Sequence, residues 1–497
     1  MTNGGRGMVA PPGPGPASTV DVAIVGSGFG GIGMGYRLKQ AGIHDFVILE
    51  RAEGVGGTWW WNTYPGCQCD IPSHLYSLSF ALNPAWSRTY PLQEEIRDHL
   101  ERTAVRLGLM PHMRFRHDVQ WVRWDDELRL WHIATSRGAL TARVVVGAAG
   151  TFTEPRVPNI RGRETFGGHA FHSGQWDHSV ALAGKRVAVV GTGASAIQIV
   201  PSIQPDVERL YVFQRTPPWV MPHTDRPITS VERWLFERLP VLQRIPRAFA
   251  YLLRECASPA FTRHTRLLAP LEWHARRHMR RQVKDRGLRK RLLPSYRIGC
   301  KRILLSNKWY PALQEANVEL VTEPISEITP RGIRTLTSEV ELDVVVYATG
   351  FAVTEVPFAR RVVGRDGQTL SEVWEGSPRA HKNSTVPGFP NFFLVPGLQT
   401  GYSSQVFMIE AQLRYVVEAL VAMRERGAHA IEVRPEAFRK WNDAVARRMP
   451  RTVWSSGGCV SWYLDRHGLS TPAWPDFTWK FRKETREFDL ASYSALG

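Results

Sequence analysis

A glycine-rich segment near the start of the chain has the spacing that binds the pyrophosphate of a dinucleotide. Gly26, Gly28 and Gly31 follow the order G-x-G-x-x-G directly after an apolar run. The first glycine permits a tight turn, the second lets the backbone approach the phosphates, and the third lets a helix pack closely on a strand. Glu50 directly follows the next apolar run, where a carboxylate can accept hydrogen bonds from a ribose diol. This segment predicts a dinucleotide with an unmodified ribose.

The same pattern recurs in the middle of the chain, with alanine in the third glycine position. Its members are Gly191, Thr192, Gly193, Ser195 and Ala196. Arg215, followed by Thr216, stands as far beyond Gly191 as Glu50 stands beyond Gly26. A carboxylate there would repel the 2′-phosphate of NADP, whereas a guanidinium can bind it with two charge-assisted hydrogen bonds. The second segment therefore predicts an NADPH site.

Short apolar runs flank both segments, as expected of buried parallel strands. Residues 22–25 and 46–49 enclose the first helix, and residues 187–190 and 211–213 enclose the second. Residues 343–351 form another strand and a turn of small residues, similar to residues 144–150. The fold class is therefore α/β, with two Rossmann-like dinucleotide-binding domains, the NADPH domain inserted in the domain of the first glycine segment, and a helical insertion.

The expected domain limits follow from these runs and from the glycine- and proline-rich start of the chain. They are a disordered tail at 1–18, the first part of the domain with the first glycine segment at 19–155, the NADPH domain at 156–339 with a helical insertion at about 219–299, and the second part of the first domain with a C-terminal segment at 340–497.

Two further segments carry a specific family resemblance. The first runs from Gly56-Gly57-Thr58-Trp59 through Tyr64-Pro65-Gly66 to Asp70, and the second places Phe166, Gly168, His172, Trp176 and Asp177 at the spacing FxGxxxHxxxW[PD]. Both resemble the signatures of type I Baeyer–Villiger flavin monooxygenases, and the resemblance extends from Asp21 to about Phe481. Related enzymes that oxidise amines and sulfides usually have a different ending to the second signature. The resemblance thus favours ketones as substrates.

This resemblance implies an enzyme that uses FAD, NADPH and O2 to convert a ketone to an ester or lactone through a C4a-peroxyflavin. Such a peroxide attacks a carbonyl only as an anion, so a fixed cation beside it would support the reaction. By resemblance, Arg302 is this cation and Asp70 is the carboxylate that orients it. An arginine suits the role because it keeps its charge at every physiological pH.

The resemblance also implies the cofactor contacts. Lys301 would hold the 2′-phosphate together with Arg215 and Thr216, and Trp462 would shield the nicotinamide. The FAD contacts would be Glu50, Thr58, Trp59, Asp70 and Tyr76. Residues 396–405 depart from the usual family pattern and are expected near the pyrimidine edge of the flavin.

Simpler interpretations stand beside these roles. Lys301 and Arg302 end a basic stretch and could be ordinary surface cations, and Trp59 could pack the core. His172 lies in an expected linker, which favours a structural role over proton transfer. An N- or S-oxygenating flavin monooxygenase remains the sibling alternative. A flavin-dependent disulfide reductase would need a C-x-x-x-x-C pair after the first helix and strand.

The net charge of +17 is concentrated in one part of the chain. Residues 231–300 contain 17 Lys and Arg against 5 Asp and Glu, without a nucleic-acid-binding motif, so no nucleic-acid partner is expected. This window should be helical between its prolines. Its apolar stretches, such as 234–235 and 251–253, are expected to pack on the protein as a lid over the NADPH domain, in preference to touching a membrane. No apolar run approaches the ~18 residues of a membrane span, so no integral membrane association is expected.

The five cysteines are few for a chain of 497 residues. They have neither zinc-type pairs nor the density of a disulfide scaffold, which predicts no metal site and a reducing cytoplasm. Cys67 and Cys69 are separated by a single residue, which is the wrong spacing for a redox dithiol, so a packing role is expected for both.

Overall fold

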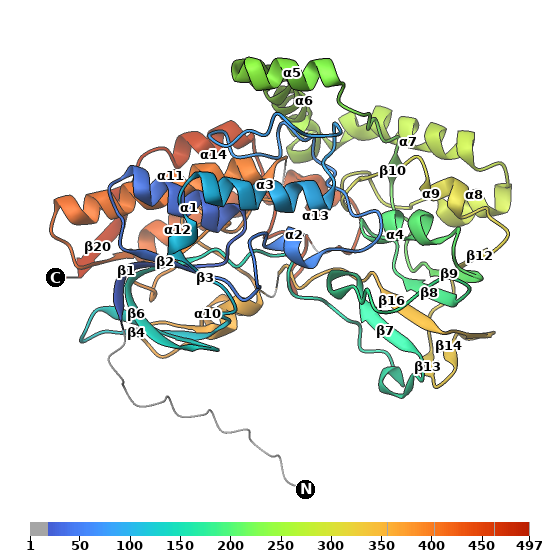
Figure 1. Ribbon diagram of the computed structural model, residues 1–497, viewed down its shortest axis with the longest axis horizontal. Helices are drawn as coiled ribbons and strands as arrows, with labels where there is room; N and C mark the ends of the chain where they lie inside the picture. Colours follow the sequence, from blue (N-terminus) through green and yellow to red (C-terminus); the bar gives the residue numbers. More distant parts are fainter. Residues whose placement is uncertain (1–17, 355, 402, 462, 497) are drawn as a thin grey trace, which may run out of the picture.

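The structure is a computed structural model that describes residues 18–354, 356–401, 403–461 and 463–496. The predicted tail at 1–18 lies, except for its last residue, outside the described residues. Two sheets stand side by side, each with its own helices (Figure 1). The α/β fold class with two Rossmann-like units is confirmed.

The first sheet has the strand order β17-β4-β5-β6-β1-β2-β3, with β18 paired to β6. Its members are β1 (Thr19–Val25), β2 (Phe46–Leu49), β3 (Met113–Arg114), β4 (Val119–Asp125), β5 (Leu130–Thr135), β6 (Gly138–Gly147), β17 (Val362–Val363) and β18 (Phe392–Leu394). The strands β18, β6, β1, β2 and β3 run parallel, whereas β4, β5 and β6 form antiparallel pairs.

Both faces of this sheet are buried, which explains the continuous apolar runs of β1 and β2. Ile24 and Ile48 point into a core shared with the helices α1 (Phe29–Gln40), α3 (Gln93–Arg106) and α11 (Gln405–Glu425). Ala23 and Val47 belong to the opposite core, which includes α10 (Leu370–Trp374). A Cβ on Gly33 would lie 2.4 Å from Leu413, so glycine lets α1 approach α11 closely.

The second sheet is entirely parallel, with the order β12-β9-β8-β16-β7. Its members are β7 (His169–His172), β8 (Arg186–Val190), β9 (Arg209–Phe213), β12 (Val318–Val321) and β16 (Val344–Tyr347). Helix α4 (Ala196–Ile203) packs on one face. The small antiparallel sheet of β13 (Glu327–Thr329), β14 (Gly332–Arg334) and β15 (Glu339–Glu341) covers the other face.

The membership of β16 corrects the predicted domain limit at residue 340. Val344 pairs with both His169 and Val187, so this strand lies inside the second sheet. The chain therefore returns to the first unit only after Tyr347. An apolar run predicts a buried strand but does not indicate to which of two similar sheets the strand belongs.

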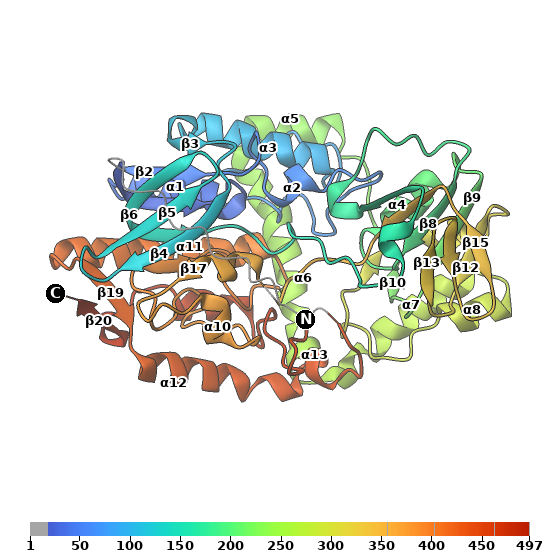
Figure 2. The same ribbon diagram turned by 90° about the horizontal axis from the view of Figure 1, so that it is seen from below.

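The segment between β10 (Val220–Met221) and β11 (Leu304–Leu305) is an insertion that forms helices, as predicted. It consists of α5 (Ser230–Arg238), η4 (Pro240–Gln243), α6 (Arg244–Thr262), η5 (Thr265–Leu268), α7 (Ala269–Gln282) and α8 (Arg286–Leu292). Helix α6 runs between the two units (Figure 2). It is tied to the first unit and the C-terminal region, since the Arg247 Nη1 donates to the oxygen of Ser77 at 2.7 Å and Arg263 pairs with Asp476 at 2.9 Å.

The expectation that the apolar residues of this insertion pack as a lid is wrong for α5 and α6. Trp234, Leu252 and Leu253 are each more than half exposed, while Leu235 and Tyr251 are partly buried. The side of α6 that faces the protein carries the polar contacts of Arg247 and also the partly buried Tyr251. The polar side of the helix thus provides the contacts that the apolar side was expected to make.

Shorter elements complete the fold. The helices are α2 (Thr58–Trp61), α9 (Trp309–Ala312), α12 (Pro435–Ala446), α13 (Val453–Ser456) and α14 (Thr478–Glu484). Two strands pair antiparallel, β19 (Ala430–Val433) and β20 (Tyr493–Leu496). The 3₁₀ turns are η1 (Met110–His112), η2 (Arg163–Thr165), η3 (Ser173–Gln175), η6 (Pro357–Arg361), η7 (Met449–Arg451) and η8 (Leu490–Ser492). Among the helices of the described residues, none has the length and hydropathy that a membrane span requires.

Candidate active site

A cavity of about 1340 Å³ brings together segments from both units and from the insertion. Its wall includes these residues predicted from the sequence: Thr58, Trp59, Asp70, Tyr76, Gly191, Thr192, Gly193, Ser195, Arg215, Thr216, Lys301 and Arg302. A smaller neighbouring cavity of about 120 Å³ is bordered by Gly26, Gly28 and Glu50, and also by Thr58, Trp59 and Tyr76. Gly31 and Ala196 line neither cavity because they stand behind their turns, at the start of α1 and α4.

The first glycine turn connects β1 to α1 at the smaller cavity. Gly26 has φ of +108°, and a Cβ there would lie 2.5 Å from the Ala148 oxygen. A Cβ on Gly31 would lie 1.9 Å from the Gly26 oxygen, which explains the requirement for glycine at the third position. Glu50 follows β2, and its Oε2 accepts hydrogen bonds of 2.8 Å from both the amide and the hydroxyl of Ser27. The carboxylate is thereby fixed beside the turn.

The second glycine turn has the same construction between β8 and α4. Gly191 has φ of +115°, and a Cβ there would lie 2.4 Å from the Ala348 oxygen. No atom lies within 4 Å of the Cβ position of Gly193, which borders the large cavity. Thr192 Oγ1 donates to the Thr216 oxygen at 3.1 Å and so ties the turn to the segment that follows β9. An open backbone surface at a helix start is suited to phosphate.

Two cations face the cavity near the second turn. Arg215 is exposed and makes no ion pair among the described residues, and Lys301 likewise has no carboxylate partner there. Burial, together with the positive charge of Arg215, lowers the pKa of Lys301. The Lys301 Nζ lies 5.1 Å from the centre of the Tyr296 ring, which orients it. Two neighbouring cations without an acid are the arrangement that an anion such as a phosphate stabilises.

Asp70 and Arg302 form the charged centre of the large cavity. Arg302 Nε and Nη2 donate to the two carboxylate oxygens of Asp70, one hydrogen bond to each. Burial opposes ionisation of Asp70, but the charge and hydrogen bonds of Arg302 prevail and lower its pKa. Burial also disfavours the charge of Arg302, but the charge and hydrogen bonds of Asp70 outweigh the effect of burial and raise the pKa of the guanidinium. Both groups are therefore ionised, and 33% of the Arg302 side chain is still exposed.

A second guanidinium at this centre was not predicted from the sequence. Arg254, on α6 of the insertion, donates from Nη2 to the backbone oxygen of Asp70 at 3.4 Å. Burial lowers the pKa of Arg254, while the charge of Asp70 acts in the opposite direction. The cluster of Asp70, Arg254 and Arg302 thus carries one net positive charge. The available signal was the heptad spacing of Arg247 and Arg254, which places both on the side of α6 opposite its apolar residues.

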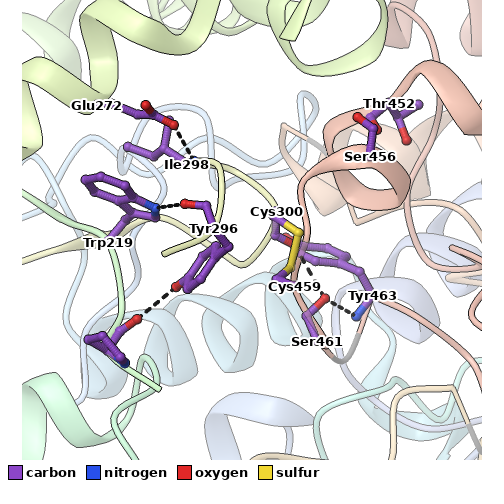
Figure 3. Close-up of a disulfide and its surroundings, with 11 residues drawn as sticks. Trp219, Glu272, Tyr296, Ile298, Cys300, Thr452, Ser456, Cys459, Ser461 and Tyr463 are labelled. Carbon is purple, nitrogen blue, oxygen red and sulfur yellow. Dashed lines mark hydrogen bonds between the residues drawn. A yellow bond between two sulfur atoms is a disulfide. The ribbon is translucent and has the colours of Figure 1, made fainter. Parts of the chain in front are cut away.

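The segment that carries Lys301 and Arg302 is held in place by a disulfide and several hydrogen bonds (Figure 3). Cys300 forms a disulfide with Cys459, 159 residues later in the sequence. Trp219 Nε1 donates to the Tyr296 oxygen at 2.8 Å. The Ile298 amide donates to Glu272 at 3.1 Å. This disulfide was not predicted from the sequence, where the small number of cysteines had indicated a reducing compartment.

The C-terminal segment beyond Cys459 reaches the same cavity. Ser461 borders the cavity, and its Oγ donates to the Cys300 oxygen at 3.4 Å. Tyr463 is buried beside Arg302, and burial raises its pKa. Trp462, which was predicted to shield the nicotinamide, lies outside the described residues. The segment is thus attached to the neighbourhood of Arg302 on both sides of that position.

Trp59 and Tyr76 form an aromatic pair between the two cavities. The Trp59 Nε1 donates to the Tyr76 hydroxyl at 3.1 Å, and their rings meet nearly at right angles with centres 5.7 Å apart. The second ring contact of Tyr76 is with Phe29, the first residue of α1. Trp59 is thus buried, as core packing requires, and it also borders a cavity.

His172 has the geometry of a structural residue. It ends β7, and its Nδ1 accepts a hydrogen bond of 3.0 Å from the Gly174 amide. Burial lowers its pKa to about 4, so the imidazole is neutral at physiological pH. It packs against Phe351, just beyond the return strand β16. These contacts support the expected structural role in preference to proton transfer, but the residue lies in a strand of the second sheet and not in a linker.

Residues 396–401, which were expected near the pyrimidine edge of the flavin, border the large cavity. The peptide bond between Val395 and Pro396 is cis, and the Gly397 amide donates to Gln412 of α11 at 3.0 Å. The departure of this segment from the usual family pattern therefore lies within the wall of the site.

Cys67 and Cys69 are buried in the core as expected, and burial raises the pKa of Cys67 to about 12. A thiol with so high a pKa is a poor nucleophile at neutral pH. The described residues contain no cluster of His, Cys, Asp and Glu that could hold a metal ion.

Comparison with known proteins places this geometry among flavin-dependent oxygenases. Residues 23–252 match the family model described as pyridine nucleotide-disulphide oxidoreductase. The chain is 52% identical to a Baeyer-Villiger monooxygenase of Streptomyces coelicolor, over 96% of this chain and 93% of the relative.

Two solved structures agree with this similarity. A closed crystal structure of cyclohexanone monooxygenase superposes with a TM-score of 0.87 at 28% identity, covering 97% of this chain and all of that chain. A crystal structure of OTEMO in complex with FAD and NADP superposes with a TM-score of 0.86 at 26% identity, covering 96% of this chain and 99% of the other. The similarity to each of these proteins extends across both sheets and the insertion.

Proposed function

The chain belongs to the family of Baeyer–Villiger monooxygenases, and we propose from this premise that its large cavity is the place where FAD, NADPH, O2 and a ketone meet. The enzyme is an FAD-containing, NADPH- and O2-dependent monooxygenase that converts ketones to esters or lactones. The observation that supports this site assignment best is the Asp70–Arg302 pair, which stands in one cavity with residues of both nucleotide turns.

The residues around the first turn fit FAD. The absence of side chains at Gly26 and Gly28 leaves backbone accessible at the start of α1, where the helix favours a negatively charged group. We assign Gly26, Gly28 and Gly31 to the pyrophosphate-binding turn and Glu50 to the ribose. Thr58, Trp59, Asp70 and Tyr76 would form the wall around the remainder of this cofactor, because they border one or both cavities.

The residues around the second turn fit NADPH. Gly191, Thr192, Gly193, Ser195 and Ala196 would bind the pyrophosphate. Arg215, Thr216 and Lys301 would bind the 2′-phosphate, which supplies the anion that these cations lack among the described residues. Trp462 keeps its proposed role beside the nicotinamide on the strength of its neighbours Ser461 and Tyr463.

When bound, FAD and NADPH supply the electrons and the activation of O2. The contribution of the protein is electrostatic: Arg302 presents a permanent positive charge that stabilises the oxyanion formed when the ketone carbonyl is attacked. Asp70 holds the guanidinium through two parallel hydrogen bonds, and Arg254 holds the backbone of Asp70. Charge that is fixed before the reaction requires no reorganisation during it, which is why such a pair accelerates the step.

The alternative reactions are less well supported. A disulfide reductase would need a reactive dithiol near the first turn, but Cys67 and Cys69 are buried thiols, and burial raises the pKa of both. The Cys300–Cys459 disulfide lies far along the chain from that position. N- or S-oxygenation would not need the cation at Arg302, because amines and sulfides are themselves nucleophiles.

Two organisational features complete the proposal. We assign FAD to the unit of the first sheet and NADPH to the unit of the second, with the insertion forming part of the wall between them. We also propose the cytoplasm as the compartment, although a disulfide is uncommon there and would be subject to reduction. Cell fractionation in the native organism, with blocked thiols, would test both the compartment and the state of this disulfide.

The proposed function is tested by measuring ester or lactone formation against NADPH consumption for a panel of linear, cyclic and aromatic ketones. Oxygen from isotopically labelled O2 should appear in the product, one atom for each NADPH. NADPH oxidation without a labelled product for any ketone, combined with efficient sulfide oxidation, would replace the ketone assignment by S-oxygenation.

A further inference from the structure

The insertion presents an apolar surface to the outside of the molecule. We name it the α5–α6 apolar face, and its members are Val231, Trp234, Leu239, Val241, Ile245, Phe249, Leu252 and Leu253. Each has more than half of its surface exposed. Single exposed apolar residues are ordinary, but eight of them within residues 231–253 mark a candidate interaction site. Figure 1 shows α5 at the top edge of the molecule, with α6 beneath it and α7 along the same edge.

The orientation of α6 gives this exposure its significance. Ile245, Phe249, Leu252 and Leu253 follow the i, i+4, i+7, i+8 spacing of one helix face. Their exposed fractions range from 57% for Leu252 to 65% for Ile245. The opposite face is anchored: Arg247 reaches Glu410, and Glu255 accepts from the Thr478 amide at 3.1 Å. A helix fixed by its polar side cannot rotate to bury the apolar side within the same molecule.

The charge around this face indicates what covers it. Arg233, Arg238 and Arg244 are exposed among its apolar members, with Glu237 the exposed acid of the same stretch. The whole window 231–300 has 17 basic against 5 acidic residues, and α7 and α8 continue this charge. A second copy of the chain would bring the same positive charge against itself. An anionic lipid surface instead offers both an apolar layer and neutralising phosphates.

We propose that the α5–α6 apolar face binds peripherally to the surface of a bilayer containing anionic phospholipids. The apolar side chains enter the boundary between headgroups and acyl chains, with Trp234 and Phe249 as the large anchors. Arg233, Arg238 and Arg244 contact the headgroup phosphates. The face is separate from the residues assigned to cofactors, so this binding is independent of the proposed oxygenase function.

The apolar part of the proposal is tested with the full-length holoenzyme and sedimenting vesicles of phosphatidylglycerol mixed with phosphatidylcholine. The triple variant Ile245→Ser, Phe249→Ser, Leu252→Ser should bind these vesicles at least about tenfold more weakly. The matched control is Val105→Ser, Leu128→Ser, Leu336→Ser, whose three positions are likewise more than half exposed elsewhere on the molecule. The control should bind as the unsubstituted enzyme does. Equal binding of the two triple variants, or no binding by the unsubstituted enzyme, would overturn the proposal.

The charge part is tested on the same vesicles. Replacing Arg233, Arg238 and Arg244 by Gln should reduce binding to the mixed vesicles by at least about tenfold. The same change at the exposed Arg161, Arg331 and Arg439 should leave binding unchanged. Vesicles of pure phosphatidylcholine should bind weakly. Binding that is indifferent to lipid charge would contradict the assigned role of these arginines.

Two further measurements distinguish lipid binding from a folding defect and from self-association. The thermal unfolding temperature and the turnover of a water-soluble ketone without vesicles should be the same in all variants, which establishes that each is folded. In sedimentation velocity without lipid, the unsubstituted enzyme should not form a dimer that disappears when Ile245, Phe249 and Leu252 are replaced. Such a dimer would assign the face to a second copy of the chain and reject the lipid surface.

Discussion

Asp70 and Arg302 lie 232 residues apart in the chain, yet each oxygen of the Asp70 carboxylate accepts a hydrogen bond from the Arg302 guanidinium. Asp70 belongs to the loop after α2, and Arg302 lies at the end of the insertion, after its last helix α8. The pair forms only when the first unit and the end of the insertion are correctly placed. The electrostatics of the proposed oxygen transfer therefore depend on the assembly of the whole molecule.

Replacement of Arg302 by Met should separate cofactor reduction from product formation. We expect NADPH to reduce the flavin at a rate near that of the unsubstituted enzyme, while ester formation falls by at least about 100-fold, because the oxyanion loses its fixed cation. Rapid-mixing absorbance and product analysis measure the two steps. Arg302→Lys keeps the positive charge but cannot donate two parallel hydrogen bonds, so its rate of ester formation should lie between those of the unsubstituted enzyme and the Met variant. Ester formation at the native rate in the Met variant would refute the assignment.

Replacement of Arg254 by Met should change the pH dependence of turnover. The charge of Arg254 contributes to the lowered pKa of Asp70, so its loss should raise that pKa and move the acidic limb of the kcat profile to higher pH. Arg254→Lys should restore most of the limb. Arg247→Met, on the same helix but bound to Ser77 and Glu410, is the matched control and should leave the limb in place. If the acidic limb of Arg254→Met does not shift, Arg254 has no electrostatic effect on Asp70 and only contributes to packing.

Replacement of Arg215 by Glu should reverse part of the coenzyme preference. We expect KM for NADPH to rise by about 100-fold, since a carboxylate would face the 2′-phosphate, and KM for NADH to change by less than about threefold. Steady-state kinetics with both coenzymes measure this difference. Arg209→Gln, at the start of the strand that Arg215 follows, controls for surface charge. Equal losses with NADPH and NADH would contradict the phosphate assignment.

Reduction of the Cys300–Cys459 disulfide should destabilise the enzyme and loosen the Arg302 segment. A link across so long a loop lowers the entropy of the unfolded chain and so raises the free energy of unfolding by about 2–4 kcal/mol. The unfolding temperature should therefore fall by on the order of 3 °C in dithiothreitol. The Cys300→Ser, Cys459→Ser double variant should show the lower temperature with or without reductant. Cys256→Ser, which removes an exposed free thiol, should keep the response to dithiothreitol. An unchanged temperature in the double variant would show that the link adds nothing to stability.

Acid should destabilise the folded protein through its buried histidines. Burial lowers the pKa of His99, His172 and His381 to about 4, below the ordinary histidine value of 6.5 that applies to the unfolded chain. Between these two values the unfolded state binds more protons, so stability is greatest above about pH 6.5 and is lost as the pH falls towards 4. At about pH 5, each of these buried histidines should lower the free energy of unfolding by about 1–2 kcal/mol relative to neutral pH. Unfolding temperatures measured from about pH 7.5 to 5 should show a smaller decline in His99→Gln than in the unsubstituted enzyme; parallel declines would contradict this cause.

Local sequence determined the parts of the site that are built from neighbouring residues. In both units the strand, glycine turn, helix and second strand lie within about 30 residues, so the turn and the residue after the second strand could be predicted together. Glu50 and Arg215 accordingly stand where their spacing from Gly26 and Gly191 predicted. The pairing of Asp70 with Arg302 spans distant segments, and only the family resemblance indicated it.

The features that could not be predicted from the sequence are those that depend on long-range packing. The disulfide joins Cys300 and Cys459 across a sequence separation of 159, for which no spacing rule exists. Helix α6 was correctly expected, but its apolar side was assigned to the interior because most amphipathic helices pack that way. Arg254 was overlooked for the same reason, since it occupies the polar side that turns inward.

The Cys300–Cys459 link also determines how the molecule would respond to a cut in its backbone. The covalent ring that it closes includes β16, a strand of the second sheet, and the connection back to the first sheet. A protease that cleaves once between these cysteines would produce two fragments that migrate as one species until a reductant separates them. The chain segment that joins the two nucleotide-binding units is therefore secured twice, once by its peptide bonds and once by sulfur.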